Sequence, residues 1–258
     1  AVTPETFELL TDYVIEHYFK HPSYWLVDGC PYFSIYEVNT FLATFGGDYA
    51  RAGEAIARFR EKVKAAGFPD LHLNGVLFGL GGILSQAVAA LGLNSTTSYV
   101  WIHHNILPDF PATYEKAASQ YMNSVRNGGG SNGLENGAAG IPVPYHLNIS
   151  MGWDSSPRCG NVTPGEWLRR RDYPFGAVIV DNTPYLFKKY LAEAKAWTLA
   201  KPESERIVVI NSWNEWGEGS YLEPDTENGM GYLEAVRDVF GSQQANGTGT
   251  AGERTVKN

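Results

Sequence analysis

The sequence predicts an α/β protein in which helices cover a parallel sheet. Segments of strand and helix character alternate five times along the chain, which is the pattern of parallel strands joined by crossover helices. The length of 258 residues and the hydrophobic share of 43% are sufficient for a large buried core. Two architectures build such a sheet, a (β/α)8 barrel and an open doubly wound sheet.

The first part of the chain opens with a helix. Thr3 supplies a capping hydroxyl, Pro4 suits the first helical turn, and Glu5 lies near the positive end of the helix dipole. The apolar stripe of this helix continues to about residue 20. The segments predicted next are a strand at residues 31–38, a helix at 52–66, a strand at 71–79, a helix at 83–91 and a strand at 98–103.

The second part of the chain continues the alternation. Its predicted segments are a helix at residues 114–125, a loop at 127–140, a strand at 145–151, a helix from residue 183, a strand at 206–210 and a helix at 232–240. Residues 241–258 are polar and are predicted to be a disordered tail. Residues 1–240 are therefore expected to form the folded domain.

Length and glycine placement bear on the choice of architecture. A (β/α)8 barrel takes roughly 250 residues, but only five strands are recognisable here. An open doubly wound sheet normally carries a glycine-rich turn after its first strand. The segment Gly79-Leu80-Gly81-Gly82 lacks the third glycine at the required offset. The residues alone leave both architectures open.

Charge and cysteine content exclude several classes of protein. The net charge of −8 and the lack of a basic stripe argue against nucleic acid as a partner. No apolar run approaches the length of about eighteen residues that indicates a membrane span. Two cysteines are too few for a disulfide framework or a cysteine-rich zinc site. The adjacent His103 and His104 would point to opposite faces of a strand, so no metal site is expected.

The ends of the predicted strands are rich in aromatic, acidic and amide side chains. Active groups of parallel α/β proteins gather at these ends. Aromatic faces beside carboxylates and amides suit a sugar, because its C–H face stacks and its hydroxyls form hydrogen bonds. The residues concerned are Tyr36, Trp101, His103, Trp153, Asp154, Trp213, Asn214 and Trp216.

Glu215 and Glu218 are the strongest catalytic candidates. On a straight strand, residues three apart face opposite sides. Gly217 and Gly219 allow the backbone to turn, so we expect both carboxylates to converge on one pocket. Close carboxylates separate in pKa and provide an acid and a base, which cleavage of a glycosidic bond requires. Glu223 continues the acidic run and is a candidate for substrate contact.

Several motifs resemble the glycoside hydrolase family 99-like, or WbsX-like, proteins. INSWNEWGEGSYLEPD (residues 210–225), followed by GMGYLE (229–234), resembles the signature of that family. MGWDSSPR (151–158) resembles its Trp-Asp-x-x-x-Arg segment, and HPSYWLVDGCPYFSIY (21–36) resembles its lead-in to a barrel strand. DNTPYLFKKYL (181–191) also fits the family pattern.

The resemblance implies a fold of the (β/α)8 TIM-barrel type that is incomplete at its N-terminus, with about five strand–helix units. It implies that Glu218 is the general acid/base. Glu215 would assist the sugar 2-hydroxyl in a retaining reaction through an anhydro-sugar intermediate. Trp153, Asp154 and Arg158 would line the sugar subsites. No metal or other cofactor is implied.

Three functions remain open at this point. The first is a glycoside hydrolase that acts on an oligo- or polysaccharide, in the manner of an endo-α-mannosidase. The second is a glycosyltransferase of surface polysaccharide biosynthesis, and the third is a non-catalytic carbohydrate-binding remnant of the barrel. Exposed strand edges predict self-association. The compartment is not assigned, with a periplasmic or secreted location favoured over a cytoplasmic one.

Overall fold

The computed structural model describes residues 2–160, 162–170 and 172–241. Its central feature is a six-stranded sheet in the order β1-β2-β3-β4-β6-β9. Strands β2, β3, β4, β6 and β9 are parallel neighbours, and the short β1 pairs with β2 in the antiparallel sense. The strands are β1 (Leu26–Val27), β2 (Cys30–Ile35), β3 (His72–Val76), β4 (Ser95–Thr97), β6 (Tyr145–Ser150) and β9 (Val208–Asn211).

The sheet is strongly curled. Strands β2 and β6 are separated by two other strands, which would place them about 14 Å apart in a flat sheet. Nevertheless the Tyr32 hydroxyl on β2 is hydrogen-bonded to His146 Nδ1 on β6, at 3.2 Å. The curl therefore brings the inner faces of these strands together as one side of a barrel. The described residues form a half-barrel, and a closed eight-stranded barrel is not confirmed.

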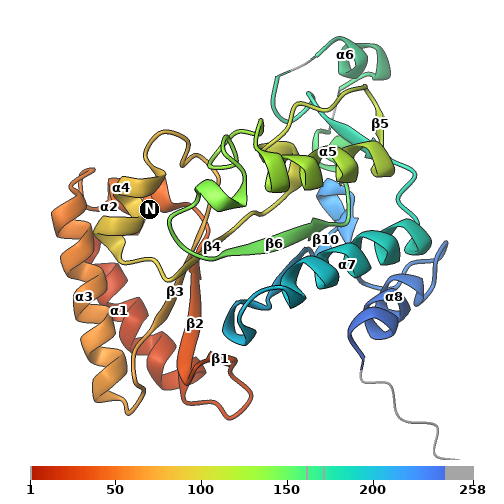
Figure 1. Ribbon diagram of the computed structural model, residues 1–258. Coiled ribbons are helices and arrows are strands. Elements are labelled where there is room, and N and C mark those ends of the chain that lie inside the picture. The colour runs from red at the N-terminus through yellow and green to blue at the C-terminus, as the bar shows by residue number, and fades with distance from the viewer. Residues whose placement is uncertain (1, 161, 171, 242–258) are drawn as a thin grey trace, which may run out of the picture.

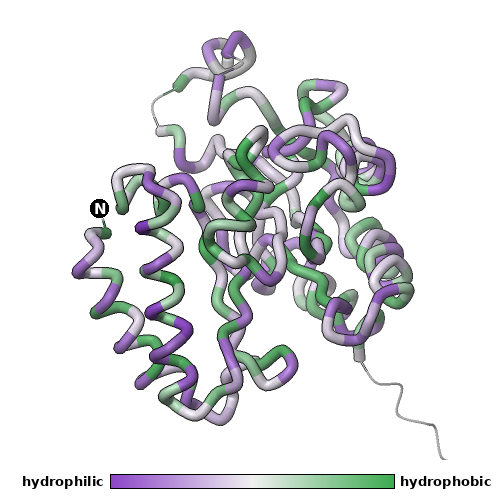
Figure 2. Tube along the Cα trace, turned by 60° about the vertical axis from the view of Figure 1, so that its left-hand side comes forward, coloured by the Kyte–Doolittle hydropathy of each residue, from purple (hydrophilic) through white to green (hydrophobic). Residues whose placement is uncertain are grey.

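Helices cover the outer face of the curled sheet (Figure 1). The helices are α1 (Pro4–Val14), α2 (Val38–Thr44), α3 (Tyr49–Ala65), α4 (Leu84–Leu91), α5 (Tyr114–Asn127), α6 (Pro164–Arg169), α7 (Pro184–Leu199) and α8 (Gly231–Phe240). A π-helical turn, Ile15–Phe19, extends α1. Hydrophobic and hydrophilic residues alternate along α1 and α3, so each helix has an apolar side to bury (Figure 2).

Capping residues fix the starts of these helices. Thr3 Oγ1 accepts a hydrogen bond from the Thr6 amide at 3.1 Å, and Asp48 caps α3 in the same way. Thr113 and Thr183 cap α5 and α7. The helices predicted at residues 4–20, 52–66, 83–91, 114–125, 183 onward and 232–240 are thus confirmed.

Four of the five predicted strands are confirmed and the third is wrong. The strand predicted at residues 98–103 lies instead at Ser95–Thr97, and Trp101–His103 form a 3-10 turn. The segment Ser95–Thr97 is polar because it faces the sheet interior, where its hydroxyls are hydrogen-bonded. The apolar and aromatic character of residues 98–103 reflects burial of a turn, since Val100 and Trp101 lie in the core.

Two small sheets and one short helix were not predicted. A three-stranded sheet has the order β5-β8-β7, and β10 pairs with β11 as an antiparallel hairpin. These strands are β5 (Ala112–Thr113), β7 (Trp153–Asp154), β8 (Val178–Val180), β10 (Asn214–Glu215) and β11 (Ser220–Tyr221). The unpredicted helix is α2. Strands of two or three residues are too short to show a hydrophobic period.

The inner face of the half-barrel is polar. Ser34 Oγ donates to Asn74 Oδ1 at 2.8 Å, and Asn74 Nδ2 donates to Ser95 Oγ at 2.9 Å. The same Ser95 oxygen is hydrogen-bonded to His72 Nε2 at 2.8 Å. The Tyr32 ring stacks on His72, with centroids 5.1 Å apart. This network stabilises the inside of the sheet through matched donors and acceptors.

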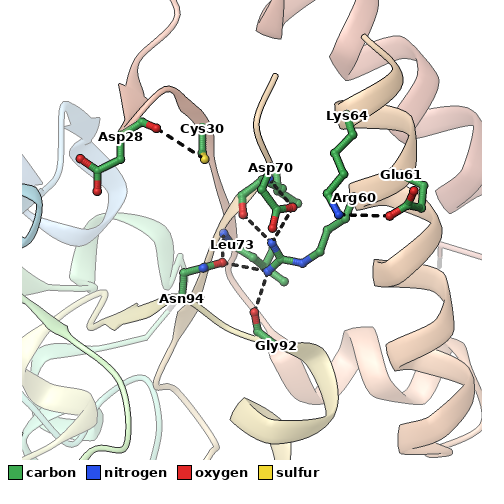
Figure 3. Close-up of polar contacts among 10 residues, drawn as sticks. Asp28, Cys30, Arg60, Glu61, Lys64, Asp70, Leu73, Gly92 and Asn94 are labelled. Atoms are coloured by element: carbon green, nitrogen blue, oxygen red, sulfur yellow. Dashed lines mark hydrogen bonds and ion pairs between the residues drawn. The ribbon is translucent and has the colours of Figure 1, made fainter. Parts of the chain in front are cut away.

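One arginine joins α3 to the N-terminal ends of β3 and β4 (Figure 3). Arg60 donates to the carbonyl oxygens of Leu71, at 2.6 Å, and of Gly92, at 2.7 Å. It also donates to Asn94 Oδ1 at 2.8 Å and forms an ion pair with Asp70 at 3.1 Å. The guanidinium thus satisfies backbone groups that would otherwise lack partners at the start of two strands.

No helix in the described ranges combines the length and the apolar character needed to cross a bilayer. The tail predicted at residues 241–258 lies, apart from Gly241, outside the described residues.

Candidate active site

The candidate catalytic residues lie on a compact hairpin that follows β9. Glu215 ends strand β10, and Glu218 ends the 3-10 turn Trp216–Glu218, directly before β11. Ser212 Oγ donates to the Ser220 carbonyl at 2.8 Å and accepts from the Glu215 amide at 3.3 Å. The buried Ser220 donates to the Gly152 carbonyl. These bonds attach the hairpin to the ends of β6 and β9.

A left-handed glycine makes the turn possible. Gly219 has a φ of +62°, a region that residues with a Cβ rarely adopt. A Cβ at this position would lie 3.2 Å from both the amide nitrogen and the Cβ of Asp154. Gly219 therefore permits the backbone to turn after Glu218 and to pack closely on strand β7. Only one of the two glycines singled out in the sequence adopts this conformation, because Gly217 has no positive φ.

Glu218 is enclosed and held at both oxygens. Its side chain is only 13% exposed. The Tyr99 hydroxyl donates to Oε2 at 3.1 Å, and Arg158 Nη2 forms an ion pair with Oε1 at 3.1 Å. Burial raises the pKa of Glu218 above its ordinary value, against the opposing effects of Tyr99 and Arg158, and the charge of Glu215 raises it further. A carboxyl group with a raised pKa is suited to donate a proton.

Glu215 and two tyrosines share the electrostatic environment of Glu218. Glu215 is exposed, so it has access to solvent and to a ligand. Tyr36 and Tyr99 pack edge to face, with ring centroids 5.0 Å apart. Burial and the charge of Glu218 raise the pKa of Tyr36 to about 12, and the pKa of Tyr99 is raised by the same causes. Both phenols therefore remain protonated donors at neutral pH.

Arg158 links the acid to an aromatic wall. Its guanidinium lies 5.7 Å from the ring centroids of both Trp153 and Tyr173, within the range of a cation–π contact. Arg158 Nη2 also donates to the Tyr173 hydroxyl at 2.9 Å. Trp153 is 1% exposed, so its ring supports Arg158 from the interior. Asp154 accepts from the Ser156 amide at 2.9 Å, which shapes the turn that carries Arg158.

The remaining hairpin residues form an exposed aromatic surface. The Trp216 ring stacks on Tyr221 with centroids 3.7 Å apart and an interplanar angle of 13°. Trp216 Nε1 donates to Glu223 Oε2 at 2.6 Å, so Glu223 orients this indole. Trp213 and Asn214 are exposed on the same hairpin. These four positions could contact a sugar, which remains a prediction.

His103 belongs to the periphery of this site. Its ring stacks on Phe78 with centroids 4.1 Å apart and lies 6.0 Å from the ring of Tyr99. Burial lowers the pKa of His103 to about 4, so the ring is neutral at physiological pH. Among the described residues, no group of three or more His, Cys, Asp and Glu side chains could hold a metal ion.

Sequence reasoning missed Tyr99 and Tyr173 as site residues. Tyr99 follows directly on the true end of β4, the position where active groups are expected. Placing the strand at residues 98–103 put Tyr99 inside a strand and concealed it. Tyr173 lies in the segment between α6 and β8, and its sequence carries no signal for a contact with Arg158.

The chain was compared with known proteins. The family described as Glycosyltransferase WbsX matches residues 3–236. The protein WxcX of Xanthomonas campestris pv. campestris, described as uncharacterized, is 33% identical over 93 residues, which are 36% of this chain and 12% of WxcX.

Two solved structures of the GH99 endo-α-mannosidase from Bacteroides thetaiotaomicron are 18% identical to this chain. They cover 92% of it, with TM-scores of 0.49 and, for the complex with bis-tris-propane, 0.51. The chain spans 61% and 65% of their lengths. At this identity the likeness of the second structure concerns the fold alone. It agrees with a curled half-barrel sheet. Because the family match extends over most of the sequence, the chain belongs to the WbsX glycosyltransferase family and is a WbsX-like, GH99-like protein.

Proposed function

We propose that this protein hydrolyses glycosidic bonds in an oligo- or polysaccharide. The observation that carries the proposal is the enclosed Glu218 carboxyl group, whose pKa is raised beside the exposed carboxylate of Glu215. An acid and a base with separated pKa values are the groups that glycoside hydrolysis needs. The exposed indoles of Trp213 and Trp216 on the same hairpin support a sugar ligand.

Each carboxyl group has a distinct role in the proposed reaction. Glu218 donates its proton to the glycosidic oxygen as the bond to C1 breaks. Glu215 accepts the proton of the sugar 2-hydroxyl, whose oxygen attacks C1 and forms an anhydro sugar. Water then attacks C1, giving its proton to Glu218, while Glu215 returns a proton to O2. The configuration at C1 is retained after these two displacements.

The surroundings of Glu218 support its role as a proton donor that is also recharged. Tyr99 and Arg158 stabilise the ionised form that remains after proton transfer, whereas burial favours the protonated form. These opposed effects bring the two protonation states closer in free energy. General acid–base catalysis is most efficient in that condition.

The experiment is a comparison of Glu218→Gln with the wild type on a panel of bacterial polysaccharides and α-mannans. New reducing ends and the size of the products are measured. We expect the wild type to release reducing ends and Glu218→Gln to lose at least about a hundredfold in rate while still binding the same glycan. Glu54→Gln, an exposed change on α3, is the matched control and should retain full activity. Equal rates for Glu218→Gln and the wild type would refute the assignment.

Glycosyl transfer is a second candidate, because the family that matches this chain is described as a glycosyltransferase family. The two reactions differ in the acceptor of the sugar. A transferase elongates an acceptor glycan from an activated donor and releases no free reducing end. Radiolabelled nucleotide-linked sugars and a purified acceptor glycan would reveal transfer. Transfer that Glu218→Gln abolishes, in the absence of hydrolysis, would replace the first proposal by the second.

A further inference from the structure

A cavity of about 390 Å³ lies beside the candidate acid. One wall is the segment that follows β4 and includes Ile102, Ile106 and Leu107. The other wall is the segment that leads into β8 and includes Tyr173 and Ala177. The volume lies within the range of small-ligand pockets, about 300–1,000 Å³. None of the residues assigned above to catalysis lines this cavity, apart from the newly recognised Tyr173.

Both walls of the cavity are connected to Glu218. The first segment begins at Tyr99, whose hydroxyl donates to Glu218 Oε2. In the second segment, the Tyr173 hydroxyl accepts from Arg158, which pairs with Glu218 Oε1. A ligand in the cavity would therefore lie next to the proton donor. In a glycosidase, the leaving group occupies the side of the site next to that donor.

The lining of the cavity is mostly apolar and carries no charged side chain. Ile106 is 93% exposed, although exposed aliphatic side chains gain nothing from contact with water. The polar exception is Asn105, whose Nδ2 donates to Ser124 at 2.7 Å. Its Oδ1 is buried without a hydrogen-bond partner among the described residues. The cavity thus offers apolar contact together with one acceptor for a ligand hydroxyl.

We propose that this cavity is the leaving-group subsite and that it selects a neutral deoxy sugar, such as a 6-deoxyhexose. This inference rests on the proposed glycoside hydrolysis. A methyl group in place of a hydroxymethyl group contacts Ile106 and Ala177 without burying an unpaired hydroxyl. A ring hydroxyl donates to Asn105 Oδ1. A uronic acid or a phosphorylated sugar is disfavoured, because no cation lines the cavity to pair with it.

The test uses paired probes that differ only at C6. Methyl 6-deoxyhexosides and methyl hexosides of the α-D-manno and α-D-galacto series are titrated against the Glu218→Gln protein, and ligand-observed NMR gives the dissociation constants. In at least one series we expect the deoxy probe to bind about tenfold more tightly than its hydroxylated partner. Ile106→Asn and Ala177→Asn should reduce this preference below about threefold.

The exposed position of Ile106 makes Ile106→Asn a change that the fold tolerates, and thermal unfolding verifies this. Leu9→Asn, a similar change of an exposed aliphatic residue on α1, is the matched control and should leave the preference unchanged. Equal binding of both probes in both series would overturn the inference. A preference that survives both Ile106→Asn and Ala177→Asn would also overturn it, because the probe would then lie elsewhere.

Failure of this inference and failure of the proposed function give different results. Wild-type protein that releases reducing ends but shows no deoxy preference would overturn the subsite and leave hydrolysis intact. A deoxy preference that depends on Ile106, in a protein that releases no reducing ends from any glycan, would overturn hydrolysis and retain the specificity of the cavity.

Discussion

Replacement of Gly219 by alanine should destabilise the protein and impair its activity together. The left-handed backbone at Gly219 costs an alanine roughly 1–2 kcal/mol. The added Cβ would also lie 3.2 Å from Asp154, closer than ordinary contact, and overpacking of this kind costs about 1–3 kcal/mol. The expected loss in the free energy of unfolding is therefore about 2–4 kcal/mol. Relief of the contact would displace Glu218, which directly precedes this residue.

Gly229 provides a matched control for the backbone effect. It has a φ of +54°, but a Cβ there would meet nothing within 4 Å. Gly229→Ala should therefore lose only the roughly 1–2 kcal/mol that the left-handed backbone costs, with little change in activity. Urea unfolding followed by circular dichroism gives both free energies. Release of reducing ends at a saturating glycan concentration gives the activities.

The difference between the two variants tests the reasoning. Equal destabilisation by Gly219→Ala and Gly229→Ala would show that the close approach to Asp154 has no energetic weight. Full activity of Gly219→Ala would refute the view that this turn positions Glu218.

Three further predictions concern other contacts. Arg60→Met should lower the free energy of unfolding by about 3 kcal/mol, because backbone carbonyls lose a charged donor; the exposed Arg58→Met should lose no more than about 1 kcal/mol in the same urea titration. Tyr99→Phe removes a hydrogen bond that lowers the pKa of Glu218, so the alkaline limb of the pH–rate profile should move to higher pH. Burial lowers the pKa of His104 to about 4, so the unfolded chain binds its proton first and stability should fall as the pH drops from about 6.5 towards 4; His104→Gln should flatten this dependence in urea titrations at several pH values.

Periodicity and capping residues allowed most of the fold to be predicted. Phe59 and Val63 lie in the core at helical spacing, and Thr183 caps α7. These signals are local, and tertiary contacts agree with them. The crossover order of the parallel sheet then followed from the alternation of strands and helices.

The third strand shows where local signals fail. Ser95 and Thr97 are buried without being apolar, because partners on neighbouring strands satisfy their hydroxyls. No pattern within β4 indicates those partners. Trp101 suggested a strand, yet it is buried in a turn where its indole donates to the Asn148 carbonyl at 3.1 Å.

The candidate site was partly predictable for a related reason. Glu215 and Glu218 lie in one short segment between glycines, so their proximity follows from sequence. Arg158 and Tyr99 reach Glu218 from residues 60 or more positions away, and only the fold brings them there. The burial of Trp153 could not be foreseen either, since strand β7 is too short to show which side faces inward.

The hydrogen-bonded inner face of the half-barrel has a consequence for sequence variation. Ser34, Asn74, Ser95 and His72 form one chain of donors and acceptors across three strands. Replacing a single member by an apolar residue of equal size would strand its neighbours without partners, whereas coordinated replacement would not. Among homologous chains these positions should therefore covary as a set, and size alone should be a poor guide to which exchanges are tolerated.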